Sequence, residues 1–135
     1  SWQLNGKLEI VPPFEQNEID HFFKDIDVLL FPSQWKESFG LTVREAISRN
    51  VWVIATDCGG PIEDLINGEN GEIVAMDDID AFRTTIVRLL YNPACLANYQ
   101  NPYPENLRYF SQQAAELNTL LGDIVVHTKK APLHS

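Results

Sequence analysis

The chain contains four short apolar runs, at residues 8–11, 27–31, 51–55 and 71–75. Each run has the length of a β-strand, and most lack the alternation of apolar and polar positions that a half-exposed strand shows. Unalternating runs are typical of strands that are buried on both faces of a parallel sheet. The pattern therefore predicts four buried strands.

Segments of helical periodicity lie between and after these runs. Apolar side chains recur at spacings of three and four over residues 15–24, 40–49 and 80–90. Pro61 predicts the first turn of a further helix over residues 61–66, since proline is favoured at that position. Strands and helices that alternate in this way indicate an α/β fold with a parallel sheet.

Turn and cap residues agree with these boundaries. Asn67-Gly68 and Asn70-Gly71 are strong turn pairs directly before the fourth strand. Asn50 follows the second helix at the position where a left-handed residue commonly ends a helix, and asparagine is used there next after glycine. These signals place element ends independently of the apolar pattern.

The C-terminal part of the chain is expected to follow a loop. Residues 101–106 interrupt the pattern, and Ser111 is placed to cap a last helix over residues 112–121. Residues 101–135 are therefore predicted to be a C-terminal helix and tail, within a single domain that spans residues 1–135.

Composition and charge restrict the partners. Hydrophobic residues make up 44% of the 135 residues, enough for a packed core, and no run of eighteen apolar residues is present. The net charge of −9 argues against nucleic acid as a partner and also works against phosphorylated ligands unless local donors outweigh it. Cys58 and Cys95 match no metal or redox spacing, which favours a reducing compartment.

Gly40 marks the most suggestive position, because it begins a helix directly after the second predicted strand. A helix start presents unpaired backbone N–H groups and a partial positive charge, and therefore suits an anion. In parallel α/β sheets, ligands usually bind at this carboxyl-terminal edge. A glycine there would allow a diphosphate to approach the backbone closely.

Two glutamates flank this helix start. Glu45 lies one turn inside the helix, and because helical side chains lean toward the N-terminus, its carboxylate is expected to point back at the helix start. There it would accept both hydroxyls of a ribose, while Glu37, from the preceding loop, would accept hydroxyls of a second sugar. The alternative is that Glu45 is a solvated helix residue and Glu37 a loop carboxylate beside the helix dipole.

Residues 31–74 strongly resemble the nucleotide-binding region of retaining GT-B glycosyltransferases of the group 1 type, and the resemblance extends over about residues 8–90. It implies a Rossmann-like parallel sheet with helices on both faces, as part of the C-terminal, donor-binding domain of such an enzyme. The shared elements are Pro32-Ser33, Glu37-x-Phe39-Gly40-Leu41, Glu45-Ala46, Val53-Ile54-Ala55, Gly59-Gly60, Glu63 and Asn70-Gly71.

The resemblance assigns roles to these residues. Glu37 would be the catalytic-site residue that contacts hydroxyls of the donor sugar, and Glu45 would contact the nucleotide ribose. The backbone amides around Phe39, Gly40 and Leu41 would face the diphosphate or the sugar. Family members transfer a sugar from a nucleotide-diphosphate sugar with retention at the anomeric carbon, usually without a metal or another cofactor.

Three further features of the sequence each allow two interpretations. Gly59 and Gly60 would approach the donor or form a tight turn, and Glu63 would serve a cap or loop hydrogen bond or a ligand. Asp78 and Asp80 match the Asp-x-Asp metal motif of glycosyltransferases of another fold, but capping of the following helix by Asp77 or Asp78 is favoured.

The family's arginine–lysine clamp on the diphosphate and its N-terminal acceptor domain have no counterpart here. The chain is therefore expected to be a fragment, inactive on its own, of a cytoplasmic enzyme, with attachment to the inner face of the membrane as an alternative. The parent's acceptor would be a carbohydrate or glycolipid. A homodimer would cover the sheet edge left by missing strands. A non-catalytic domain that binds sugar nucleotides or proteins is the alternative function.

Overall fold

A three-stranded parallel sheet forms the centre of the protein in the computed structural model, which describes residues 6–104 together with Thr119 and Leu121. The strand order is β1-β2-β3, and Leu29 lies opposite Val53 in the register. The strands are β1 (Val28–Phe31), β2 (Trp52–Thr56) and β3 (Gly71–Val74). The helices are η1 (Gln16–Glu18), α1 (Ile19–Phe23), α2 (Leu41–Ser48), η2 (Gly60–Ile62), α3 (Ile79–Tyr91) and η3 (Pro93–Leu96).

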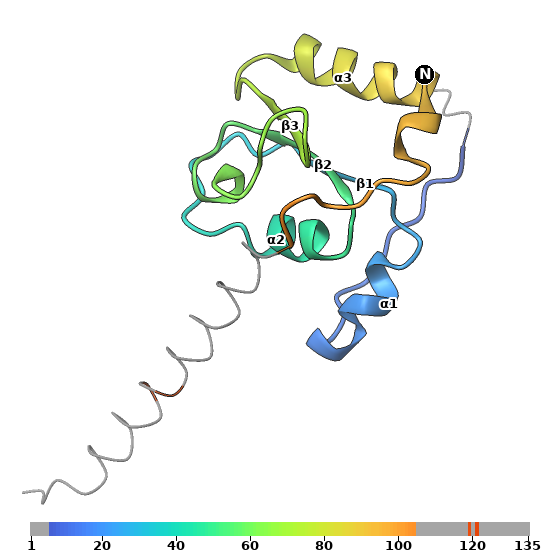
Figure 1. Ribbon diagram of the computed structural model, residues 1–135. Helices are drawn as coiled ribbons and strands as arrows, with labels where there is room; N and C mark the ends of the chain where they lie inside the picture. Colours follow the sequence, from blue (N-terminus) through green and yellow to red (C-terminus); the bar gives the residue numbers. More distant parts are fainter. Residues whose placement is uncertain (1–5, 105–118, 120, 122–135) are drawn as a thin grey trace, which may run out of the picture.

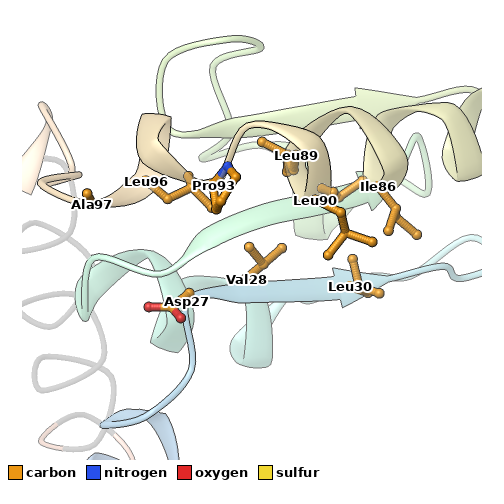
Figure 2. A pocket seen from close by; sticks show the side chains of 10 residues that line it. Asp27, Val28, Leu30, Ile86, Leu89, Leu90, Pro93, Leu96 and Ala97 are labelled. Carbon is orange, nitrogen blue, oxygen red and sulfur yellow. The ribbon is translucent and has the colours of Figure 1, made fainter. Parts of the chain in front are cut away.

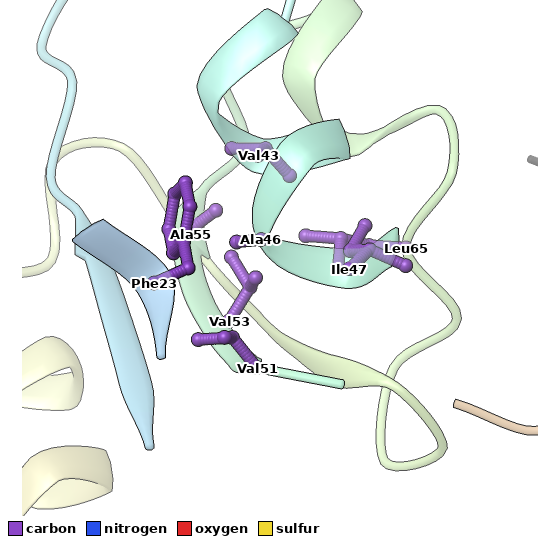
Figure 3. Close-up of a cluster of buried hydrophobic side chains, with 8 residues drawn as sticks. All are labelled: Phe23, Val43, Ala46, Ile47, Val51, Val53, Ala55 and Leu65. Atoms are coloured by element: carbon purple, nitrogen blue, oxygen red, sulfur yellow. The ribbon is translucent and has the colours of Figure 1, made fainter. Parts of the chain in front are cut away.

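Helices cover both faces of this sheet (Figure 1). On one face, Val53 and Ala55 of β2 pack with Ile47 of α2 and Phe23 of α1 in the larger core cluster (Figure 3). On the other face, Ile54 packs with residues of α3. Successive strand residues point to opposite faces, so both sets of β2 side chains are buried. The predicted Rossmann-like α/β class is therefore confirmed.

The predicted strand at residues 8–11 is wrong. Leu8 and Ile10 are 74% and 88% exposed, and the segment has no strand assignment. A strand is held by hydrogen bonds to a neighbour, and β1 pairs only with β2 among the described residues. Apolar composition alone therefore does not order this segment, and the outer edge of β1 remains open.

Two predicted helices are shorter than expected. The segment 15–24 divides into η1 and α1, and 61–66 contains only the 3-10 turn η2. The amide of Asn70 explains the second case: its Oδ1 accepts from the Ile66 N–H at 2.7 Å, and its Nδ2 donates to the Asp64 carbonyl at 2.9 Å. These bonds hold the chain in a turn rather than a helix.

The predicted helix at 112–121 and its cap Ser111 lie outside the described residues, apart from Thr119 and Leu121. Among the described residues, no helix combines the length and the apolar character needed to cross a membrane.

Asn50 ends α2 as predicted, with a φ of 60°. Its N–H donates to the Ile47 carbonyl at 3.2 Å, and the Val51 N–H donates to the Ala46 carbonyl at 3.0 Å. This pair of bonds is a Schellman motif, which satisfies the last carbonyls of the helix. The Asn50 Oδ1 also accepts from the Asn101 N–H at 2.9 Å, and so ties the later chain to α2.

Asp78, rather than Asp77, caps α3. Its Oδ1 accepts from the Ala81 N–H at 2.8 Å, so the favoured capping interpretation of the Asp-x-Asp pattern is confirmed. We expect Asp78→Ala to lower the free energy of unfolding by about 1 kcal/mol. Urea unfolding followed by circular dichroism would measure this, with the exposed Asp77→Ala as a control that leaves stability unchanged. Equal losses in the two variants would contradict the assignment.

Candidate functional site

Two loops are joined backbone to backbone just beyond the carboxyl ends of β1 and β2. The Glu37 N–H donates to the Cys58 carbonyl at 2.7 Å, and the Gly60 N–H donates to the Glu37 carbonyl at 2.9 Å. These bonds make an isolated bridge between Glu37 and Gly59. The loop that carries Glu37 is therefore fixed against the loop that carries the glycine pair, at the edge where ligands of parallel sheets usually bind.

Ser33 orients the Glu37 side chain. The Ser33 Oγ lies 3.1 Å from the Glu37 Oε1 and 3.1 Å from the Trp35 carbonyl oxygen, so these two acceptors share its one hydroxyl proton. The Ser33 carbonyl accepts from the buried Thr56 Oγ1 at 2.6 Å. Glu37 itself is half-buried. Sequence reasoning placed Ser33 in the shared motif but gave it no role, and its distance from Glu37 along the chain carries no signal of this contact.

The first turn of α2 offers backbone donors. Gly40 occupies the N-cap position, and no side chain there caps the helix. Gly40 itself is buried, whereas the residues on either side of it, Phe39 and Leu41, are 73% and 66% exposed. A helix start without a side-chain cap suits an anionic ligand in general, and the anion site at Gly40 stays a prediction.

The glycines have a structural reason that the sequence did not reveal. A Cβ on Gly40 would lie 2.3 Å from the Pro61 Cα, and a Cβ on Gly60 would lie 2.3 Å from the Ser38 carbonyl oxygen. Gly59 has a φ of 96°, which favours glycine. Close packing at Gly40 and Gly60 and the positive φ of Gly59 therefore account for the three glycines without a ligand. The Gly59-Gly60 pair forms the tight turn that was one of its two predicted roles.

Glu45 does not point as predicted. Its carboxylate lies next to Arg49, one turn later, with 2.5 Å between Glu45 Oε2 and Arg49 Nη1. The expectation that the carboxylate points back toward the helix start is therefore wrong for this structure. The lean of helical side chains is a weak preference, and a guanidinium at i+4 outweighs it. Glu45 is 31% exposed and remains accessible from one side.

Arg44 belongs to α2, and its side chain is 9% exposed. Its Nε lies 2.5 Å from the Asp64 Oδ2, and its Nη2 lies 3.5 Å from the Glu63 Oε2. Glu63 therefore makes a contact between loop and helix, and its predicted role as a ligand stays untested. This ion-pair cluster joins α2 to the segment after η2, and so braces the two sides of the site.

Cys58 sits within this loop pair but is not a nucleophile. It is fully buried, and burial raises the pKa of its thiol, while a hydrogen bond with Thr56 acts in the opposite direction. A raised pKa keeps the thiol protonated at neutral pH, and the thiol is a poor nucleophile compared with the thiolate.

A larger cavity lies elsewhere among the described residues. It measures about 450 Å³ and lies between β1 and the segment formed by α3 and η3, with Val28 and Leu30 on one side and Leu89 and Leu90 on the other (Figure 2). No predicted site residue lines it. A smaller hollow of about 90 Å³ adjoins Pro32 and Thr56. We place the candidate site at the carboxyl ends of β1 and β2, because the polar groups and the start of α2 gather there.

Comparison with known proteins points in one direction. The sequence profile of the family described as "Glycosyl transferases group 1" matches residues 2–114. The lipopolysaccharide core biosynthesis mannosyltransferase LpcC of Rhizobium leguminosarum bv. viciae is 30% identical over 116 residues, which cover 81% of this chain and 33% of that protein. This chain spans 33% and 26% of the length of two curated relatives that it matches.

Two solved structures share the fold. The C-terminal domain of a glycosyl transferase group 1 family protein (LpcC) from Francisella tularensis superposes with a TM-score of 0.58 at 26% identity, covering 73% of this chain and 49% of that one. Sucrose-phosphate synthase from Thermosynechococcus elongatus gives a TM-score of 0.66 at 23% identity, covering 87% and 30%. The second likeness bears on the fold alone.

Proposed function

Because this chain belongs to the group 1 glycosyl transferases, we propose that it is the donor-binding part of an enzyme that transfers a sugar from a nucleotide-diphosphate sugar to an acceptor with retention. The observation that carries the proposal is the arrangement beyond β1. A half-buried carboxylate, fixed by Ser33, precedes the uncapped start of α2 at the carboxyl edge of a parallel sheet.

The diphosphate would bind at the first turn of α2. Backbone N–H groups and the helix dipole supply positive potential there, which a chain with a net charge of −9 needs locally to hold an anion. The exposed Phe39 and Leu41 flank this position. Stabilising the leaving diphosphate by fixed donors is the main contribution that such a site makes to the rate of transfer.

Glu37 and Glu45 would recognise the two sugars. Glu37 has its Oε1 bonded to Ser33, which leaves the other oxygen to accept hydroxyls of the donor sugar. Glu45, whose carboxylate lies beside Arg49 and not over the start of α2, would accept the ribose hydroxyls from that position. We propose that the sugar transfer uses neither a metal nor another cofactor. We also propose that the carbohydrate or glycolipid acceptor binds to a region of the kind that the longer relatives have outside the part matched by this chain.

The test is a comparison of sugar nucleotides with free nucleotides. We expect Glu37→Ala to weaken binding of the preferred UDP-, GDP- or ADP-hexose about tenfold, while binding of the corresponding nucleoside diphosphate changes less than twofold. Glu45→Ala should weaken both ligands by a similar factor of about five. Isothermal titration calorimetry on this chain measures all four constants.

Glu9→Ala provides the matched control, because it removes an exposed carboxylate from the segment outside the sheet. Equal and small effects of Glu37→Ala and Glu45→Ala on both ligands would overturn the role assignment. Binding of a sugar nucleotide that is insensitive to both would instead favour a non-catalytic binding domain.

A further inference from the structure

Arg49 is held from several sides at the end of α2. Its guanidinium contacts the Asp20 carboxylate of α1, with 2.6 Å between Arg49 Nη2 and Asp20 Oδ1. Its Nη1 also donates to the Glu45 carbonyl at 3.0 Å and to the Ser48 Oγ at 3.1 Å. The guanidinium carbon lies 5.8 Å from the centre of the Phe23 ring. These contacts leave the guanidinium few alternative positions.

The same guanidinium holds the carboxylate of Glu45. Arg49 Nη1 lies 2.5 Å from Glu45 Oε2, and both side chains are only partly exposed, at 23% and 31%. An exposed pair of residues four apart on a helix is usually a weak and mobile contact. Here one partner is already fixed by α1, so the pair restricts the rotamers of Glu45 at little further cost in side-chain entropy.

We propose that Arg49 is a positioning residue that fixes the Glu45 carboxylate in the orientation in which it accepts the ribose hydroxyls of the nucleotide. This inference rests on the proposed function, since it concerns the same ligand. Arg49 itself would not touch the ribose. It would act by holding one carboxylate oxygen, which leaves Glu45 Oε1 and the remaining lone pair of Oε2 for the two hydroxyls.

Charge supports this arrangement in two ways. Burial lowers the pKa of Arg49, but its hydrogen bonds and charge interactions with Glu45 and Asp20 outweigh burial and raise that pKa above its ordinary value. Arg49 therefore stays a cation over any working pH. An ionised carboxylate only accepts hydrogen bonds, and its two oxygens can together accept both hydroxyls of a diol.

The test compares nucleotides with and without the ribose hydroxyls. Arg49→Met removes the guanidinium and keeps an apolar stem over Phe23. We expect this variant to bind the preferred diphosphate among ADP, GDP and UDP roughly three- to tenfold more weakly, because Glu45 must then be ordered on binding. Binding of the corresponding 2′,3′-dideoxynucleoside diphosphate should change less than twofold. Isothermal titration calorimetry with the unsubstituted chain and with Arg49→Met measures the affinities for both nucleotides.

A matched control and a milder variant complete the design. Arg83→Met removes one positive charge from an exposed position on α3 and should change neither affinity. Asp20→Ala removes an 85% exposed anchor of Arg49 and should weaken ribonucleotide binding about twofold, which tests the proposal even if Arg49→Met does not fold.

The outcomes separate the two levels of inference. Equal weakening of ribo- and dideoxynucleotides by Arg49→Met would show a merely structural residue and overturn the proposal. Tighter binding of ribonucleoside diphosphates by Arg49→Met would also overturn the proposal, because it would mean that Arg49 competes with the ribose for Glu45. If the unsubstituted chain binds none of the three nucleoside diphosphates and none of their hexose conjugates, the proposed function itself is overturned.

Discussion

Gly60→Ala is expected to lower the free energy of unfolding by about 3 kcal/mol, which is a large part of the stability of a small domain. The added Cβ would lie 2.3 Å from the Ser38 carbonyl oxygen and 2.6 Å from the Ser38 carbonyl carbon. Both are backbone atoms, so no flexible side chain can move aside. The loop before α2 must shift as a whole or the two loops must separate.

Urea unfolding followed by tryptophan fluorescence would measure this loss. Gly6→Ala is the matched control, because a Cβ on Gly6 meets nothing within 4 Å and that residue is exposed. Identical unfolding midpoints for the two variants would show that the approach of the loops at Gly60 is not as close as described.

The same substitution should also abolish sugar-nucleotide binding at temperatures where the variant remains folded. The Gly60 N–H donates to the Glu37 carbonyl, and Ser38 separates Glu37 from the start of α2. Any shift that relieves the contact with Ser38 therefore moves both the carboxylate and the helix start. Stability and binding are coupled here because one glycine pair holds the geometry of the site.

The positions of β1, β2 and β3 were predictable to within a residue, because each carries an apolar run. The predicted burial on both faces holds for β2 but not for β1, where Leu30 is 45% exposed. The run at residues 8–11 has similar composition but no neighbour, and pairing is not encoded in a strand's own residues. Local sequence thus predicts the tendency to form a strand. The presence of a partner along the edge decides whether the strand forms.

The site was predictable in part. The helix start at Gly40 follows from local signals, and the family resemblance singled out Glu37 and Glu45. The direction of the Glu45 carboxylate was not predictable from rotamer preference, because it depends on Arg49, whose position in turn depends on Asp20, 29 residues away along the chain. Contacts between distant residues determine where these side chains point.

The role of Arg44 was also hidden from the sequence, which showed only a cation inside the motif that matched no diphosphate clamp. In the structure its side chain is 9% exposed and pairs with Asp64, which is 20% exposed. This buried charge on α2 therefore serves the loops around the site rather than a ligand.

Arg44→Met is accordingly expected to lower the free energy of unfolding by about 3 kcal/mol. Removing the guanidinium leaves the Asp64 carboxylate partly buried without its cation, and an uncompensated buried charge costs more than the intact pair contributes. The effect should persist in 0.5 M NaCl, because salt screens buried pairs weakly. Glu63→Gln is the contrasting variant: Glu63 is 69% exposed and 3.5 Å from Arg44, so the change should be small.

A double substitution decides whether the lost stability comes from that stranded charge. Arg44→Met combined with Asp64→Leu removes both charges and keeps apolar volume, and we expect it to recover most of the stability lost by Arg44→Met alone, to within about 1 kcal/mol of the parent chain. Chemical unfolding of the unsubstituted chain, Arg44→Met, Asp64→Leu and the double variant gives the coupling free energy between the two positions. If the double variant is no more stable than Arg44→Met, the guanidinium stabilises the fold through its other contacts, and the ion pair with Asp64 contributes little.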